Sequence, residues 1–201
     1  YIGGVSMASR LAWENIEPGC DPLSPGNVTC IAGGLFAGTP VPVGGKYGMA
    51  SKSPLTGFIG DSLSGSWLAV SLKRSGWDGI VVHGASDEWV RVFIDDNKVS
   101  FHDASHLLGL GTTETEEALR DEYGDDQVRT ACIGPAGENL VRVANVSNDG
   151  RKAGRTGQGA VWGSKKLKAL SIRGTGGVAV ADPETLLKLS FDILQAAQGP
   201  H

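Results

Sequence analysis

The stretch from Gly44 to Gly65 combines residue types that suit the binding of an anionic group. It begins with the pair Gly44-Gly45, and glycines let the main chain approach a ligand closely because they have no Cβ atom. Asp61 or Ser62 can cap the first turn of a helix, and a helix start adds free N–H groups and the positive end of a dipole. The stretch therefore predicts a phosphate-binding loop, and the alternative is a loop of tight turns without a ligand.

A second glycine-rich segment, residues 148–159, carries basic side chains. Arg151, Lys152 and Arg155 adjoin backbone that the glycines leave open. Cationic side chains beside exposed N–H groups suit phosphate. The alternative for this segment is a solvated basic turn.

A dinucleotide-binding fingerprint is the weaker interpretation of the second segment. Gly157-x-Gly159 precedes a predicted helix, but Trp162 occupies the third small position of the fingerprint. The next strand also ends at Arg173-Gly174, where the fingerprint requires an acidic residue. We therefore favour another kind of anion site.

No set of residues in this chain predicts catalysis. The histidines lack metal-ligand spacing and a neighbouring nucleophile, which favours structural or surface roles. They are His83, His102, His106 and His201. The carboxylates fall on turns and on an acidic helix, not in a pair suited to acid–base work.

The three cysteines, Cys20, Cys30 and Cys132, have no C-x-x-C spacing. They predict neither a disulfide framework nor a zinc or iron–sulfur site. Cys30 and Cys132 lie in apolar runs and are expected to be buried thiols in a reducing, cytoplasmic setting.

Both glycine-rich segments lie in a similar order of predicted elements. The first unit has a small-residue strand, the loop, a helix over Ser62–Ser75 and an exit strand over Gly76–Gly84. The second has a strand over Leu140–Val146, the loop, a helix over Gln158–Lys168 and an exit strand over Leu167–Gly174. Two such units predict a duplication with a pseudo-twofold axis, which would bring both loops to one site.

Hydrophobic periodicity predicts the remaining elements. The first unit's helix is apolar on two sides, so Trp67 is expected in the core. The other predictions are a helix over Met7–Ile16, a strand over Val28–Ala32, a hairpin of Trp89–Ile94 and Lys98–His102, a helix from Thr112 or Thr113 to Tyr123, a strand over Val128–Ile133, a strand-like run over Thr175–Ala181 and a helix at about 182–197.

The composition is that of an ordinary globular protein apart from its glycines. The chain has 201 residues with 40% hydrophobic and 20% charged residues. Its 30 glycines are about twice the number that an average glycine usage of about 7% would give in a chain of this length. A net charge of −4 argues against nonspecific nucleic-acid binding, and no membrane span or signal peptide is visible.

Separate runs along the chain carry a family resemblance. They are residues 21–27 (DPLSPGN), 51–58 (SKSPLTGF), 103–106 (DASH), 133–139 (IGPAGEN) and 159–168 (GAVWGSKKLK). In this order they resemble the N-terminal domain of the aldehyde ferredoxin oxidoreductases, a family of tungsten-pterin enzymes. The resemblance and the duplication together predict an α+β fold in which duplicated β-α-β units form two β-sheets with helices packed between them. Residues 1–201 are expected to be one N-terminal cofactor-binding domain of a longer enzyme.

The resemblance implies positions for the cofactor in the first unit. The family has an Arg after the glycine pair that contacts pterin, and Lys46 stands there, which keeps the charge without the planar fork. Main-chain groups of Leu63, Ser64 and Gly65 are implied to hold the phosphates and a bridging Mg²⁺. The family commonly has Asn where Leu63 stands.

The second unit is implied to contact the cofactor through Arg151, Lys152, Ala153 and Arg155. The backbone carbonyls of Leu63 and Ala153 are the implied Mg²⁺ ligands.

The implied function is a bis-pterin domain, with tungsten or molybdenum, of an enzyme that oxidises aldehydes to carboxylic acids. Electrons would pass through a 4Fe-4S cluster to ferredoxin or a similar carrier. The family's cluster cysteines and its catalytic glutamate and histidine belong to later domains, so this fragment is expected to ligate no cluster and to be inactive alone.

The implied partners are the remaining C-terminal domains and further copies in a homo-oligomer, with no nucleic acid and no membrane. The open alternatives are an unrelated nucleotide- or dinucleotide-binding domain and a non-catalytic scaffold that lost its cofactor.

Overall fold

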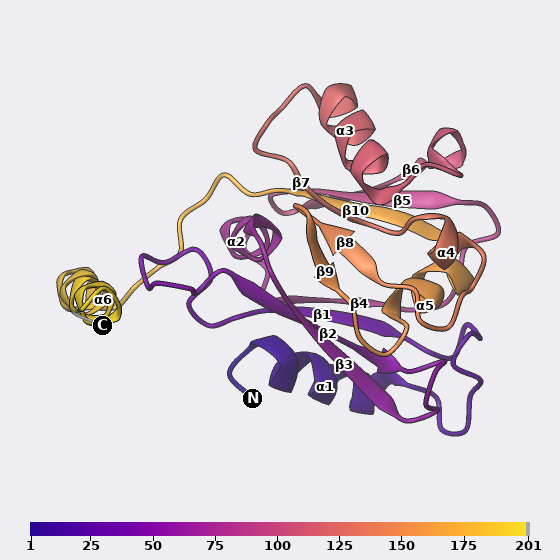
Figure 1. The fold of residues 1–201 in the computed structure, drawn as a ribbon, viewed down its shortest axis with the longest axis horizontal. Coiled ribbons are helices and arrows are strands. Elements are labelled where there is room, and N and C mark those ends of the chain that lie inside the picture. Colours follow the sequence, from indigo (N-terminus) through magenta and orange to yellow (C-terminus); the bar gives the residue numbers. More distant parts are fainter. Residues whose placement is uncertain (200–201) are drawn as a thin grey trace.

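Two β-sheets with helices between them make up the fold (Figure 1). The computed structural model describes residues 1–199. His201, considered above among the histidines, lies outside the described residues.

The first sheet is antiparallel, with the strand order β3-β2-β1-β4. Its strands are β1 (Thr29–Gly33), β2 (Lys46–Lys52), β3 (Ile59–Gly65) and β4 (Gly79–Val82). Helix α1 (Gly4–Asn15) covers the outer face of this sheet (Figure 1). Its small residues Ala8 and Ala12 pack against Cys30 and Ala50, which lets the helix lie close to the strands.

The second sheet has the strand order β6-β5-β10-β7-β8-β9, and its one parallel pair is β5 with β10. Its strands are β5 (Val90–Asp95), β6 (Lys98–Asp103), β7 (Arg129–Cys132), β8 (Val146–Asn148), β9 (Arg151–Ala153) and β10 (Leu167–Arg173). The 3-10 turn η1 (Ser105–Leu107) and helix α3 (Thr112–Tyr123) cover its outer face through Leu107 and Leu119. The short α4 (Pro135–Glu138) follows β7.

The two units predicted from the sequence share one topology. In the first, β1, β2 and β3 form a meander, helix α2 (Trp67–Arg74) follows, and β4 returns beside β1. In the second, β7, β8 and β9 form the meander, α5 (Gln158–Ser164) follows, and β10 returns beside β7. The duplication is therefore confirmed in strand order, with the β5–β6 hairpin as an addition to the second sheet.

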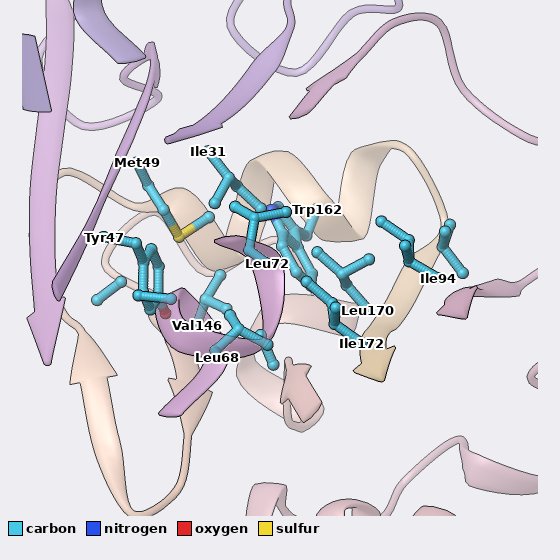
Figure 2. Packing of buried hydrophobic residues seen from close by; sticks show 14 of the residues in the cluster. Ile31, Tyr47, Met49, Leu68, Leu72, Ile94, Val146, Trp162, Leu170 and Ile172 are labelled. Atoms are coloured by element: carbon cyan, nitrogen blue, oxygen red, sulfur yellow. The ribbon is translucent and has the colours of Figure 1, made fainter. Parts of the chain in front are cut away.

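Helices α2 and α5 lie between the sheets, as predicted (Figure 1). Leu68 and Leu72 of α2 and Trp162 of α5 meet Met49 of the first sheet and Ile172 of the second in one buried cluster (Figure 2). The Trp162 Nε1–H also donates to Thr29 Oγ1 at 3.2 Å. This shared core holds the two sheets together.

The helix predicted over Ser62–Ser75 is wrong in its first turn. Residues 59–65 form strand β3, in which Gly60, Ser62 and Ser64 are buried and their neighbours are not. A burial period of two is that of a strand. Helix α2 begins at Trp67, and its cap is Ser66, whose Oγ accepts a hydrogen bond from the Leu68 N–H at 3.0 Å.

The strand predicted over Leu140–Val146 is also wrong, except at its end. Leu140 has a φ of 56°, and the Ala144 N–H donates to Val141 O, so the chain turns here. Val141 and Val143 point to solvent, and only residues 146–148 form a strand.

Two other boundaries differ from the prediction. Helix α5 ends at Ser164 because the chain turns at Lys166, whose φ is 53°, before β10. The run Thr175–Ala181 forms no strand in the described structure and is the linker to α6 (Pro183–Ala197).

The other predicted helices and the β5–β6 hairpin are confirmed. Helix α6 lies apart from the two sheets (Figure 1). Asp182 caps it by accepting from the Thr185 N–H at 3.0 Å.

Candidate functional site

The two implied cofactor segments lie on neighbouring edge strands. Leu63, Ser64 and Gly65 end β3, which is the edge of the first sheet, and Arg151–Ala153 form β9, which is the edge of the second. Strands β3 and β9 contact each other. Lys46 begins β2 and pairs with Gly65 across the ladder. Segments about ninety residues apart in sequence are thus adjacent in space.

A cleft of about 730 Å³ opens beside these strands. Its walls include Gly44, Gly45, Gly65 and Arg151. The glycine pair, the end of β3 and the basic hairpin therefore meet at one place.

The amino end of α2 also faces this cleft, through Ser66 and Trp67. Trp67 is 61% exposed, so its predicted place in the core is wrong. The reason is that α2 buries only one of its two apolar sides, the one that carries Leu68 and Leu72, whereas the side with Trp67 and Val70 lines the cleft. The positive end of the helix dipole favours an anion near this wall.

Backbone at two of the cleft glycines is open. A Cβ atom added at Gly65 would come no closer than 3.8 Å to another atom, and one at Gly45 no closer than 3.5 Å. The packing of the chain therefore does not require glycine at either position. A group that approaches the main chain from the cleft would require it.

Gly44 differs, because a Cβ there would lie 2.8 Å from Phe36 O. This glycine is needed by the fold itself.

The implied basic residues do not all face the same way. Arg151 lines the cleft, whereas the Lys152 Nζ donates to Ser147 Oγ at 2.6 Å and to Thr112 Oγ1 at 3.3 Å. Adjacent residues of a strand point to opposite faces, so Lys152 lies toward α3. The side chains of Lys46 and Arg155 are exposed.

The two implied Mg²⁺ ligands lie on the two edge strands. Leu63 in β3 is 50% exposed, and Ala153 in β9 is fully buried. Their roles as carbonyl ligands stay a prediction.

Asp149 is the acidic member of the cleft wall. Its Oδ1 lies 3.9 Å from an Arg129 NH1 nitrogen, and this ion pair offsets its charge. Burial and the nearby Asp149 carboxylate raise the pKa of Glu116, on α3.

Asn148 joins the two units through its buried side chain. The carboxamide Oδ1 of Asn148 accepts hydrogen bonds from Tyr47 Oη at 2.7 Å and from Ser64 Oγ at 3.0 Å. The sequence predicts Asn148 only as the start of the glycine-rich segment 148–159, and no sequence signal pairs it with residues 101 and 84 positions earlier.

Histidine, cysteine, aspartate and glutamate side chains form no cluster of three that could hold a metal ion in residues 1–199. The donors at the cleft are instead main-chain N–H groups and cationic side chains, a set that suits phosphate oxygens. Cys30 and Cys132 are buried as predicted, and burial raises the pKa of each thiol to about 12. No helix in the described part of the chain is long and apolar enough to cross a membrane.

The fold and the cleft define a class of protein: a two-sheet domain with open glycine backbone and basic side chains where the sheet edges meet. More particularly, the chain belongs to the aldehyde ferredoxin oxidoreductase family as its N-terminal domain, since residues 1–174 match the family described as "Aldehyde ferredoxin oxidoreductase, N-terminal domain".

Curated relatives agree with this assignment. The tungsten-containing aldehyde ferredoxin oxidoreductase of Thermococcus kodakarensis is 45% identical over 188 residues, which are 93% of this chain and 31% of that protein. The protein of the same name from Pyrococcus abyssi is 48% identical over 183 residues, covering 90% and 30%. This chain thus spans about a third of the length of these relatives.

A solved structure has the same fold. It is the active site complex BamBC of benzoyl coenzyme A reductase with 1,5-dienoyl-CoA, with a TM-score of 0.93 and 38% identity over 96% of this chain and 30% of that one.

Proposed function

We propose that this chain binds the pterin phosphates of a bis-pterin tungsten cofactor in an enzyme that oxidises aldehydes. The observation that supports this most is the meeting of open glycine backbone with a basic hairpin at one cleft. In this proposal the N–H groups at Gly45 and Gly65, with Lys46 and Arg151, hold the phosphates. A phosphate near a helix start and such side chains gains charge-assisted hydrogen bonds.

The finer assignments belong to the same proposal. Main-chain groups of Leu63, Ser64 and Ala153 lie on the two edge strands, and a Mg²⁺ between phosphates would take carbonyl oxygens there, because Mg²⁺ prefers oxygen ligands. Lys152 and Arg155 would add positive charge around the cleft without filling it. The same residues could hold a cofactor that contains molybdenum in place of tungsten.

When bound, the metal–pterin group supplies the redox chemistry: an aldehyde and water give a carboxylic acid, two protons and two electrons. This chain contributes binding and orientation of the cofactor. The electrons would leave through a 4Fe-4S cluster held by later domains and reach ferredoxin or a similar carrier. A cytoplasmic homo-oligomer is the proposed setting.

An aldehyde is favoured over an aromatic thioester as substrate. The relatives named for aldehyde oxidation are 45–48% identical to this chain, whereas the benzoyl coenzyme A reductase complex is 38% identical. A nucleotide-binding domain or an empty scaffold has no comparable support.

The experiment is to purify the full-length enzyme and to measure tungsten, molybdenum and pterin per protein, then aldehyde-dependent reduction of a viologen dye. We expect about one metal and two pterins per chain, and activity with aldehydes. Protein that contains no pterin after expression in a host that makes the cofactor would overturn the proposal. Activity with a dienoyl thioester and none with aldehydes would show that the substrate is a thioester, not an aldehyde.

A further inference from the structure

One buried carboxamide connects all segments of the proposed site. Asn148 Oδ1 accepts from the hydroxyls of Tyr47 and Ser64, at 2.7 and 3.0 Å. Tyr47 follows Lys46 in β2, and Ser64 stands between Leu63 and Gly65 in β3. Asn148 itself pairs with Arg151 across the β8–β9 hairpin. Asn148 and its two partners are therefore each next to Lys46, Gly65 or Arg151, which the proposed function assigns to the phosphates.

All three side chains are removed from water. Asn148 is fully buried, and Tyr47 and Ser64 are 1% and 3% exposed. Burial raises the pKa of Tyr47 far above its usual value, so its hydroxyl stays protonated and can donate. Hydrogen bonds between desolvated groups are stronger than the same bonds in water, and the loss of one partner leaves the other unpaired.

The hydrogen-bonding groups of this amide are not all satisfied. Asn148 Nδ2 is buried and has no hydrogen-bond partner among residues 1–199. An unpaired buried donor costs stability, and an apolar side chain of similar size would avoid that cost. The position therefore needs the carboxamide oxygen for the two bonds that it accepts.

These bonds lie at one end of a row of hydrogen bonds between β3 and the second unit. Ser62 Oγ accepts from the Arg155 N–H at 3.2 Å, and Gly60 O accepts from Gln158 Nε2 at 3.1 Å. Residues 60, 62 and 64 share the inner face of the strand. The second unit is thus attached at each of these alternate positions, and the Asn148 bonds lie at the end near the cleft.

We propose that Asn148 is a positioning residue for the cofactor site. Its carboxamide holds β2, β3 and the β8–β9 hairpin at a fixed separation, so that Lys46, Gly65 and Arg151 meet the same ligand. The proposal rests on the proposed function, because it assigns a role toward the cofactor. The side chains of Ser64 and Tyr47 act through Asn148 and do not touch the ligand.

The test uses the loaded full-length enzyme and three variants: Ser64→Ala and Tyr47→Phe, which remove one bond each, and Asn148→Leu, which removes both. The matched control is Ser171→Ala, which removes a bond of 2.8 Å between Ser171 Oγ and Thr130 Oγ1, also buried but within the second sheet. For each protein we would measure the thermal unfolding midpoint and the rate at which the enzyme releases pterin into buffer that contains excess chelator.

The Ser64→Ala and Ser171→Ala variants should lower the midpoint to a similar degree, because each loses one buried hydrogen bond. Only Ser64→Ala should speed pterin release, by roughly fivefold to tenfold. Ser64→Thr keeps a hydroxyl and should release pterin at nearly the wild-type rate. The double variant Tyr47→Phe/Ser64→Ala should match Asn148→Leu, and adding Ser64→Ala to Asn148→Leu should change nothing further, since both act on one atom.

Pterin release that stays at the wild-type rate in folded Ser64→Ala and Asn148→Leu would overturn this role and leave the proposed function standing. Equal acceleration in Ser171→Ala would also overturn it, because release would then follow general stability. Wild-type enzyme without pterin would overturn both proposals together.

Discussion

Lys46 in β2 lies directly opposite Gly65 in β3, so a cationic side chain and an open glycine backbone share one rung of the ladder. Gly65 also lines the cleft, next to Gly44 and Gly45. A ligand at this rung would meet main-chain N–H groups and an ammonium group together.

Gly65→Val should lower cofactor content more than Lys46→Ala does. The valine Cβ fits the fold, with no atom closer than 3.8 Å, so it obstructs only a ligand that approaches the backbone. We expect roughly a tenfold loss for Gly65→Val, since hydrogen bonds to a charged group contribute about 1.5–3 kcal/mol. Lys46→Ala removes a screened surface charge, and about twofold to fivefold is expected.

The control for this comparison is Gly177→Val, because Gly177 lies in the linker, where an added Cβ atom would meet no other atom within 4 Å. Metal and pterin content of the full-length variants is the measurement. Full content in a folded Gly65→Val enzyme would mean that this stretch is only a turn.

Lys46→Arg should retain the cofactor as well as the wild type, or better. A guanidinium keeps the charge and adds the planar fork that binds phosphate through two hydrogen bonds. The measurement is pterin release from the loaded enzyme at two salt concentrations. A variant that loses cofactor as fast as Lys46→Ala would contradict a phosphate contact at this position.

Arg151→Ala and Lys152→Ala should differ, although the residues are neighbours. Arg151 lines the cleft, whereas Lys152 is bonded to Ser147 and Thr112 on the other face. We expect roughly tenfold faster pterin release for Arg151→Ala, from the loss of a charge-assisted bond, and about twofold or less for Lys152→Ala. Equal effects would show that charge alone matters here, not side-chain direction.

Lys165 should make stability depend on pH. Burial lowers its pKa from 10.5 to about 8, and its Nζ donates to Asn27 O and Gly84 O. At pH values between about 8 and 10.5, Lys165 binds more protons in the unfolded chain than in the folded one. Its contribution to the free energy of unfolding therefore rises with pH.

The measurement is urea unfolding of wild type and Lys165→Met from pH 7 to 10. Other groups titrate equally in both proteins, so the stability difference should grow in favour of the wild type above about pH 8. A difference that stays constant over this range would contradict a depressed pKa.

The 201-residue chain alone should show neither iron–sulfur absorbance nor aldehyde oxidation. Cys30 lies in β1 and Cys132 in β7, on different sheets, and a cluster needs four thiolates. Visible spectra after reconstitution with iron and sulfide, and a viologen assay, are the checks. A stable brown protein would refute the assignment of the cluster to later domains.

Local signals in the sequence determined much of this protein. The periodic helices, the β5–β6 hairpin and the two-unit order followed from hydrophobic spacing and turn residues, because these depend on neighbours in sequence. The family runs carried the identity of the domain. Burial of Cys30 and Cys132 also followed from their apolar surroundings.

Only the tertiary structure decided how the segments of the proposed site are arranged and which contacts join them. Residues 59–65 became a strand because they pair with β2 and contact β9 of the second unit, which overrode a plausible helix cap at Asp61 or Ser62. Helix α2 therefore begins at Trp67 with Ser66 as its cap, and Trp67 is exposed at the cleft. The contact of Asn148 with Tyr47 and Ser64 joins residues 101 and 84 positions apart. Such a contact depends on how the two sheets stack, and stacking cannot be predicted from any single stretch of the sequence.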